Sequence, residues 1–361
     1  MWPNRYVPRA RAILAVVAGC LTLLMASQGA FAQELSLLAG DLVDRPGPGG
    51  SYSWELEYYS GLTENLAACF CWINEGHVPG NHRDGPSVQI WARKNLIDRR
   101  LSLTGGLGVY RFFDTAVSAD PRGFADVHGW GLVGSLGARW YTRGPLVYEA
   151  RAQWVETVHN IDTVSFIAGV GYQLERAARP GPMIRPFPQA ADGPRNEITL
   201  FTGQTISNSF QSQSGLGYAL EYRRGIRRWL DWTASWLYEG DQRLIRRDGI
   251  SSQAWLRRSF KSDSFSLGVG GGIYYSLDRY RRTQPGHDLP KSVAGVVTMT
   301  VAYTLSEHLV GRLSWNRIVS EYDSDADVIM LGLGFRFQAA GAAPHIAGLA
   351  SPPPGSRPRS E

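Results

Sequence analysis

Several features that carry chemistry in other proteins are scarce in this sequence. Cysteine occurs 3 times, and only Cys69 and Cys71 lie beyond the first thirty residues. Two cysteines at i and i+2 share one face of a strand but lie too far apart for a relaxed disulfide. We expect two small residues that face lipid or a neighbouring side chain, with a redox or metal site as the alternative. The sequence also has no glycine-rich phosphate loop, zinc-ligand spacing or nucleotide fingerprint, so it predicts no cofactor and no metal.

Long apolar runs are missing beyond the N-terminus. Residues 1–32 have the form of a secretory signal peptide, with an arginine-containing start, an apolar run from Ile13 to Met25 and the cleavage motif Ala30-Phe31-Ala32. A run of about 13 residues is too short to span a bilayer as a helix, which needs about 20. Val17-Ala18-Gly19-Cys20 resembles a lipoprotein lipobox and is the alternative cleavage site.

The chain is rich in glycine, aromatic residues and arginine. It has 41 glycines, 11% aromatic residues and a mean hydropathy of −0.21. This composition in an exported chain is typical of a transmembrane β-barrel; a secreted β-sandwich is the alternative. The net charge of +5 comes from arginines, such as Arg223-Arg224 and Arg257-Arg258, which crowd the second half. Anionic lipid headgroups, lipopolysaccharide phosphates or an acidic glycan suit these arginines better than nucleic acid, which we do not expect as a partner.

Alternation of apolar and polar residues with a period of two predicts an all-β, antiparallel transmembrane barrel. In the segment 146–155, for example, Tyr148 and Trp154 would face lipid while Glu149, Arg151 and Gln153 face inward. The predicted strands are residues 34–43, 52–59, 66–73, 88–94, 101–112, 129–141, 146–155 and 164–174, then 198–206, 217–223, 232–238, 252–259, 265–277, 294–305, 308–318 and 328–337.

The connections indicate an orientation in the membrane. Those at 44–51, 74–87 and 114–128 are long, and the ones between them are shorter. Outer-membrane barrels have short periplasmic turns and longer extracellular loops. We therefore expect periplasmic termini, with Glu75 and Asp84 outside. The last strand ends in Phe337 and resembles the aromatic-terminated signal read by the barrel-assembly machinery, which that resemblance implies as a partner.

One stretch of the sequence occurs twice. Gln253 lies 164 residues after Gln89 (253 − 89), and the repeat has no gap. The matching segments are Trp72–His77, Arg83–Gly85 and Gln89–Arg93, then Trp236–Asp241, Arg247–Gly249 and Gln253–Arg257. A repeat this long is too long for a solenoid unit and fits a duplicated barrel half.

The duplication sets the expected domain organisation. We expect a first half at 33–175, a Pro/Gly-rich periplasmic linker at 176–196, a second half at 197–337 and a disordered tail at 338–361. Eight strands per half allow one 16-stranded barrel with an aqueous lumen, which we favour, or two tandem 8-stranded barrels. The length of the linker favours the second arrangement, and the matched inward residues favour the first.

The repeated Gln-x-Trp-x-Arg triplet is the main candidate site. All three residues of each copy should face inward, where tryptophan offers a stacking surface and arginine a forked donor. Such a set suits a sugar ring, so we predict a pore lining. The alternative is that these residues stabilise the inner wall of the barrel by contacting one another, with arginines neutralising Glu55, Glu57 or Glu221. The candidate lining residues are Gln89, Trp91, Arg93, Arg151, Gln253, Trp255, Arg257 and Arg312.

Two other constellations have simpler interpretations. Glu75, His77, His82 and Asp84 have cation-binding groups, but the second copy lacks the histidines, so we favour a solvated loop with an Asp-Gly turn at Asp84-Gly85. His159 and Ser165 would lie near the outer rim, where small lipid A deacylases place a histidine and a serine. Their spacing does not match, so neither half assembles a nucleophile with its base and we expect no enzyme.

The duplicated topology resembles the outer-membrane barrel partners of short polysaccharide-export proteins. That resemblance implies a pore for a hydrophilic solute, with a polysaccharide in export as one candidate and a periplasmic export protein as partner. The alternatives are a lipid A-modifying hydrolase and a non-conducting structural or partner-binding barrel. We expect the protein in the outer membrane of a Gram-negative bacterium, in contact with lipid and lipopolysaccharide.

Overall fold

The structure, a computed structural model, describes most of the part of the chain predicted to form strands. It covers residues 32–45, 47, 49–118, 124–158, 160–174, 180–182, 195–207, 214–241, 246–260, 264–280, 293–320 and 325–337. The predicted signal peptide, the tail and most of the linker lie outside these residues, so those predictions stay untested. In the described part of the chain, no helix is long and apolar enough to cross a membrane.

Sixteen strands follow one another along the described residues, and each overlaps one of the sixteen predicted segments. They are β1 (Ala32–Arg45), β2 (Gly50–Gly61), β3 (Leu66–Val78), β4 (Asn81–Leu96), β5 (Leu101–Val117), β6 (Phe124–Tyr141), β7 (Leu146–Thr157), β8 (Asp162–Gln173), β9 (Asn196–Ser207), β10 (Ser214–Gly225), β11 (Leu230–Asp241), β12 (Arg246–Phe260), β13 (Phe265–Tyr280), β14 (Val293–Thr304), β15 (Leu309–Val319) and β16 (Ala326–Phe337).

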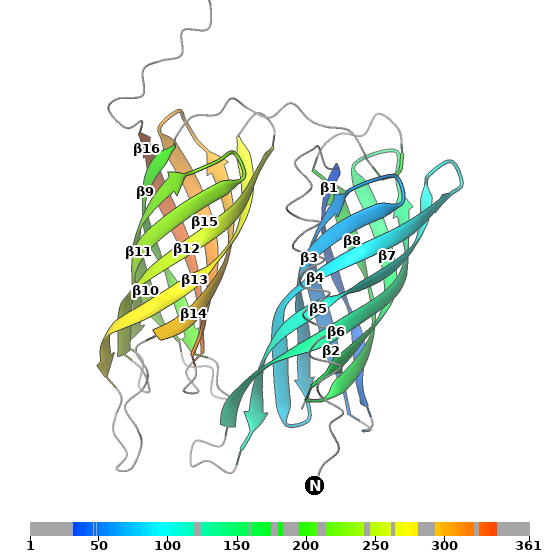
Figure 1. Ribbon diagram of the computed structural model, residues 1–361, viewed down its shortest axis with the longest axis horizontal. Helices are drawn as coiled ribbons and strands as arrows, with labels where there is room; N and C mark the ends of the chain where they lie inside the picture. The colour runs from blue at the N-terminus through cyan, green and yellow to red at the C-terminus, as the bar shows by residue number, and fades with distance from the viewer. Residues whose placement is uncertain are drawn as a thin grey trace, which may run out of the picture.

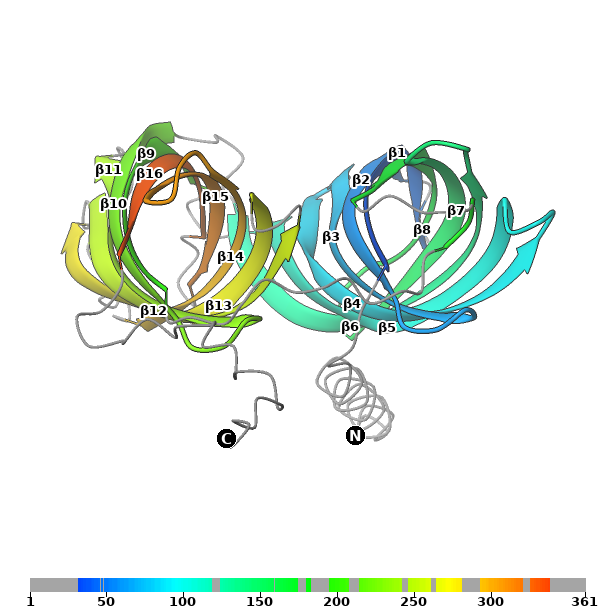
Figure 2. The ribbon, with the colours of Figure 1, turned by 90° about the horizontal axis from the view of Figure 1, so that it is seen from above.

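The strands close into two barrels of eight (Figures 1 and 2). β8 returns to pair with β1, from Glu34↔Gln173 to Arg45↔Asp162, and β16 pairs with β9 in the same antiparallel sense. The favoured expectation of one closed wall of sixteen strands is therefore wrong, and the tandem 8-stranded alternative is confirmed. Once β1 and β8 satisfy each other's backbone groups, the first barrel has no edge left to accept β9.

The predicted alternation of side chains holds around both barrels. In β7, for example, every second residue from Val147 to Thr157 is buried or nearly so and faces the interior, and the residues between them face outward. The outward set is apolar and exposed at mid-wall: six of its members each expose between 58% and 66% of their surface. These are Leu37, Leu136, Phe166, Leu200, Ile273 and Leu331. An even-stranded antiparallel barrel with an apolar outer band is the architecture of outer-membrane barrels.

Several strands are longer than predicted at the end opposite the short turns. The segment 74–87, expected to be a loop, continues the pairing of β3 and β4, with His77 paired to His82 around a tight turn at Pro79-Gly80. Asp84-Gly85 is therefore not a turn but lies within β4. The prediction failed because glycine and proline interrupt the alternation there, while a β-bulge between Asn74 and His77 absorbs the irregularity.

Glycines of the neighbouring strand make room for the large inward side chains. A Cβ at Gly106 would lie 2.6 Å from the ring of Trp91, and a Cβ at Gly270 would lie 2.6 Å from the ring of Trp255. Both tryptophans thus pack against bare backbone of the next strand. The two pairs are related by the same 164-residue offset (255 − 91 and 270 − 106), so the duplication preserves this packing.

Candidate functional site

The first copy of the Gln-x-Trp-x-Arg triplet lies on β4 and faces the inside of the first barrel. Gln89 and Trp91 are completely buried, and Arg93 is 5% exposed. Arg93 donates to the backbone carbonyl oxygens of Glu64 at 2.8 Å and Thr63 at 2.7 Å, in the turn after β2. Arg93 thus connects β4 to the turn after β2 through two hydrogen bonds, and its guanidinium does not project into open space.

The second copy lies on β12 and faces the inside of the second barrel. Gln253 and Trp255 are buried here too. Trp255 Nε1 donates to Thr233 Oγ1 at 2.8 Å, and Arg257 Nε lies 3.2 Å from Asp231 Oδ2. All three residues of each copy therefore have the predicted inward orientation.

A layer of ion pairs fills the first barrel near its short-turn end. Arg139 pairs with Glu57 and, at 2.8 Å, with Glu149. Arg151 lies 3.1 Å from Glu55 and 2.9 Å from Glu57. All five side chains are at most 1% exposed. Buried charges at such separations hold one another in place, since a charge left unpaired in this interior would be costly.

Aromatic rings complete this layer. The guanidinium of Arg139 lies 3.7 Å from the ring centroid of Tyr59, and that of Arg151 lies 5.1 Å from the ring of Trp91. Tyr59 and Trp91 meet edge to face with centroids 6.0 Å apart. Both rings are at most 1% exposed, so the cross-section of the first barrel is occupied by side chains at this level.

The start of the linker covers the nearby mouth of the first barrel. Gln173 Nε2, which faces inward at the end of β8, donates to the carbonyl oxygen of Gly181 at 3.1 Å. Arg99, in the turn after β4, donates to the carbonyl oxygen of Pro182. Gly181 and Pro182 are buried. The first barrel is thus closed by the buried layer of side chains and, at its mouth, by the start of the linker.

The second barrel has a different, more basic cluster at the same end. Arg312 pairs with Glu197, and Arg336 Nε lies 3.1 Å from Glu197 Oε2. Arg223 lies 3.0 Å from Glu221 Oε1. A hollow of ≈ 10 Å³, about the size that holds one water, lies among these groups. Its charged lining residues are Arg195, Arg223, Arg257, Arg312, Arg336, Glu197 and Asp231.

These contacts bear on the two interpretations of the inward arginines. Arg151 neutralises Glu55 and Glu57, as expected if the inward residues stabilise the inner wall. Glu221, however, pairs with Arg223 and not with an arginine of the triplet. Arg312 neutralises Glu197, a carboxylate that sequence reasoning did not single out. The inner-wall role thus has specific contacts, and the pore-lining role stays a prediction.

Of the residues considered for cation binding, only His77 and His82 come together, with ring centroids 4.3 Å apart. Glu75 faces the interior and is 1% exposed, with Arg83 Nη2 donating to its Oε1 at 2.8 Å, so it does not lie in a solvated loop. The second barrel repeats the pair, with Arg247 Nε at 2.6 Å from Glu239 Oε1. Among the described residues, no group of three His, Cys, Asp or Glu side chains could hold a metal ion.

A joint between the two barrels was not predicted. Trp72 and Trp315, both on outer faces, lie with ring centroids 4.5 Å apart. Arg317 of β15 pairs with Asp84 of β4, and His128 Nε2 lies 2.8 Å from Asp325 Oδ2. We call these six residues and Phe113 the inter-barrel joint, since the Arg317 guanidinium also lies 5.5 Å from the Phe113 ring. The sequence signal that could have revealed this joint is the presence of charged residues at outward positions of mostly apolar strands.

The remaining candidates have structural surroundings. Cys69 and Cys71 are free, buried and face the interior, and Gln89 Nε2 lies 3.2 Å from Cys71 Sγ. They therefore face neighbouring side chains and not lipid. Ser165 is buried on the inner face of β8, and His159 lies outside the described residues.

Comparisons with known proteins give distant structural likenesses only. No protein-family model matches the chain, and no curated protein matches it. The N-terminal β-barrel domain of Pseudomonas aeruginosa OprF shares 13% identity over 40% of this chain and 98% of its own, with a TM-score of 0.33. Neisserial surface protein A shares 10% over 40% and 96%, with a TM-score of 0.31. Pseudomonas putida OprB shares 9% over 89% and 97%, with a TM-score of 0.20. Likenesses this low assign no function to the chain.

Proposed function

We propose that this chain is an outer-membrane protein that crosses the bilayer as two adjoining barrels. The apolar outer bands support this location, because a water-soluble protein rarely exposes contiguous apolar surface of this extent. Outward aromatic residues near the strand ends, such as Trp140 and Tyr172 on the first barrel and Trp232 and Phe335 on the second, fit the girdles found at membrane interfaces. Fractionation of cells should recover the protein with outer-membrane markers, and recovery in the soluble periplasm would contradict the proposal.

We also propose that the two barrels do not conduct in the state described, and that the protein acts through its rims and outer faces. The observation that carries this is the buried layer across the first barrel, where Arg139, Arg151, Glu57, Tyr59 and Trp91 are all at most 4% exposed. Eight strands enclose a space just wide enough for side chains to fill. The function is then that of a membrane-anchored binding or structural barrel.

Recording in planar lipid bilayers tests the closed state. We expect no stepwise conductance from the purified protein, and a variant that trims the layer, Trp91→Ala with Arg151→Ala, should admit ions if it stays folded. Retention of the heat-modifiable migration typical of folded barrels serves as the folding control. Reproducible steps from the wild-type protein would overturn the closed state.

A pore for a hydrophilic solute is the second candidate, and one observation favours it. The interior of the second barrel contains a polar cluster, in which Thr298 Oγ1 lies 2.8 Å from Gln253 Oε1 and 2.9 Å from Asn316 Oδ1. A polar interior hydrates more readily than an apolar one. If this candidate holds, Trp255→Ala should change blockade of the current by oligosaccharides. Polysaccharide export and lipid A hydrolysis are more specific hypotheses. Mass spectrometry of lipid A from cells with and without the protein tests for lipid A hydrolysis.

A further inference from the structure

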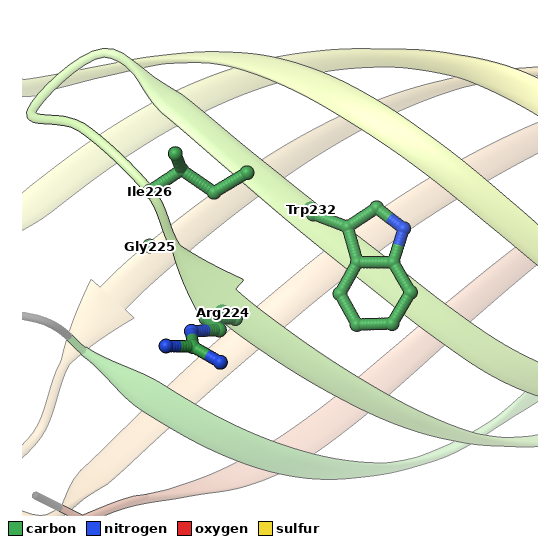
Figure 3. A pocket seen from close by; sticks show the side chains of 4 residues that line it. All are labelled: Arg224, Gly225, Ile226 and Trp232. Atoms are coloured by element: carbon green, nitrogen blue, oxygen red, sulfur yellow. The ribbon is translucent and has the colours of Figure 1, made fainter. Parts of the chain in front are cut away.

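The turn between β10 and β11 carries an exposed group of arginines and tryptophans on the outside of the second barrel. Arg224 and Trp232 are direct cross-strand partners, and both face outward. With Gly225 and Ile226 they line an open hollow of ≈ 400 Å³ (Figure 3). Arg224 has no ion-pair partner among the described residues.

More cations surround this hollow. Arg227, Arg228 and Trp229 form the tip of the turn and are exposed. Arg258, outward on β12, lies beside the turn, because its neighbour Arg257 donates its backbone N–H to the carbonyl oxygen of Trp229 at 2.8 Å. We call the set Arg224, Arg227, Arg228, Trp229, Trp232 and Arg258 the basic rim.

Among the described residues of β10, β11 and β12 and of the turn between β10 and β11, no carboxylate lies on the outer side of this rim. Asp231 follows the turn directly, but it faces the interior, where Arg223 and Arg257 hold it at 3.4 Å and 3.2 Å. On the described outer faces of β10, β11 and β12, the nearest carboxylate in sequence is Asp248, which lies at the opposite end of β12. The basic rim is therefore complementary to an anion that approaches from outside the barrel.

The duplicated half shows that the fold does not require these residues. The turn after β2 has the same backbone hydrogen bonds: Leu62 N–H donates to Leu66 at 2.9 Å, as Ile226 N–H does to Leu230 at 2.9 Å. The side chains nevertheless differ. Ser60, Thr63, Glu64, Asn65 and Ala68 stand where the second half has Arg224, Arg227, Arg228, Trp229 and Trp232. The same hairpin is thus built without a basic or aromatic rim, which points to a ligand as the reason for the rim.

We propose that the basic rim binds the phosphodiester headgroup of an anionic phospholipid of the phosphatidylglycerol class. Guanidinium groups donate to phosphate oxygens in a matching forked geometry, and tryptophan lies preferentially at the headgroup level. Below the rim, exposed Leu220 and Leu256 continue the outer wall and offer an apolar surface to acyl chains. A soluble acidic partner would not need this apolar continuation. The inference rests on the proposed membrane location, and on the short-turn end facing the phospholipid leaflet.

The duplication supplies the variant that tests the site. Arg227→Thr, Arg228→Glu and Trp229→Asn give the tip of the second turn the three residues that the first turn has at the same positions, so the hairpin should still fold. Arg224→Ser is added in a second variant. The matched control is Arg45→Gln, which removes an exposed arginine from the other end of the first barrel.

Binding is measured by native mass spectrometry of the full chain in mixed micelles that contain phosphatidylglycerol and phosphatidylcholine. The wild type and Arg45→Gln should retain phosphatidylglycerol over phosphatidylcholine, and the turn-swap variants should lose about tenfold or more of that preference. The reverse graft Thr63→Arg, Glu64→Arg and Asn65→Trp should add a second retained phosphatidylglycerol.

Three results would overturn the site: an unchanged preference in the turn-swap variants, no preference in the wild type, or stronger retention of lipid A phosphates than of phosphatidylglycerol. Membrane insertion of the same samples is read separately by flotation with vesicles. A protein that fails to insert contradicts the proposed location. One that inserts without a lipid preference contradicts only the basic rim.

Discussion

Trp72 of the first barrel and Trp315 of the second pack against each other with ring centroids 4.5 Å apart and an interplanar angle of 58°. Each has a counterpart in the other half of the chain, and both counterparts are exposed. Trp236, the copy of Trp72, is 42% exposed, while Trp72 itself is 1% exposed; Trp154, which matches Trp315, is 39% exposed. The same outward position thus serves as outer wall in one barrel and as inter-barrel joint in the other.

We expect Trp315→Ala combined with Arg317→Ala to uncouple the two barrels while both stay closed. The reason is that these two side chains supply the aromatic contact and the ion pair with Asp84. Double electron–electron resonance measures the distance between nitroxides attached at positions 136 and 331. The distribution of this distance should change from narrow in the wild type to broad in the variant.

Trp154→Ala is the matched control for that measurement, since its side chain faces outward away from the joint. It should leave the distance distribution unchanged. An equally narrow distribution in the Trp315→Ala, Arg317→Ala variant would contradict the role of these two side chains in coupling the barrels.

The buried pair Glu75–Arg83 should respond more strongly to loss of one partner than to loss of both. We expect Arg83→Met to destabilise the first barrel by ~3–5 kcal/mol, because it leaves Glu75 charged and buried. The double variant Glu75→Gln, Arg83→Met should recover most of that loss. Guanidinium unfolding followed by tryptophan fluorescence measures both, and a double variant as unstable as the single one would contradict the pairing.

Alternation along the sequence was enough to predict every strand and the inward set, including Gln89, Trp91 and Arg93. It was not enough to predict closure. Whether β8 pairs with β1 or with β9 depends on which edges meet in space, and strands such as 164–174 and 198–206 alternate in the same way in either arrangement. The linker was the only local signal for two barrels.

The candidate site was predicted in orientation but not in contacts. Arg139, which pairs with Glu57 and Glu149 in the first barrel, was not singled out, because pairing across the interior joins strands far apart in sequence. Trp72 and Trp315 were also missed as partners. An outward tryptophan has the same pattern whether lipid or a second barrel covers it, so alternation does not distinguish the two.

Gly106 should tolerate no side chain, whereas its neighbour Gly105 should. A Cβ at Gly106 would lie 2.6 Å from the Trp91 ring, and one at Gly105 would meet Leu136 Cδ2 at 3.5 Å and the Ser135 carbonyl oxygen at 4.0 Å. We expect Gly106→Ala to cost ~1–3 kcal/mol through overpacking and Gly105→Ala to stay within about 0.5 kcal/mol of wild type. Equal unfolding midpoints for the two variants would contradict the close packing of Trp91 on β5.

Cys69→Thr should stabilise the first barrel. The indole N–H of Trp255 donates to Thr233 Oγ1 at 2.8 Å in the second barrel, whereas Trp91 Nε1 is buried and has no hydrogen-bond partner among the described residues. Cys69 occupies the position of Thr233, since both precede their tryptophan by 22 residues (91 − 69 and 255 − 233) and both pair with the triplet glutamine. Threonine there would supply the missing acceptor at nearly the same volume.

The expected gain is ~0.5–1.5 kcal/mol, the usual net contribution of one buried hydrogen bond. Guanidinium unfolding of Cys69→Thr should therefore show a higher midpoint for the first barrel, and Thr233→Val should lower the midpoint for the second by a similar amount. Cys69→Val separates the hydrogen bond from β-branching, because it adds the same branched shape without an oxygen. A gain in the valine variant as large as in the threonine variant would mean that packing, and not an acceptor for Trp91, limits the stability of the first barrel.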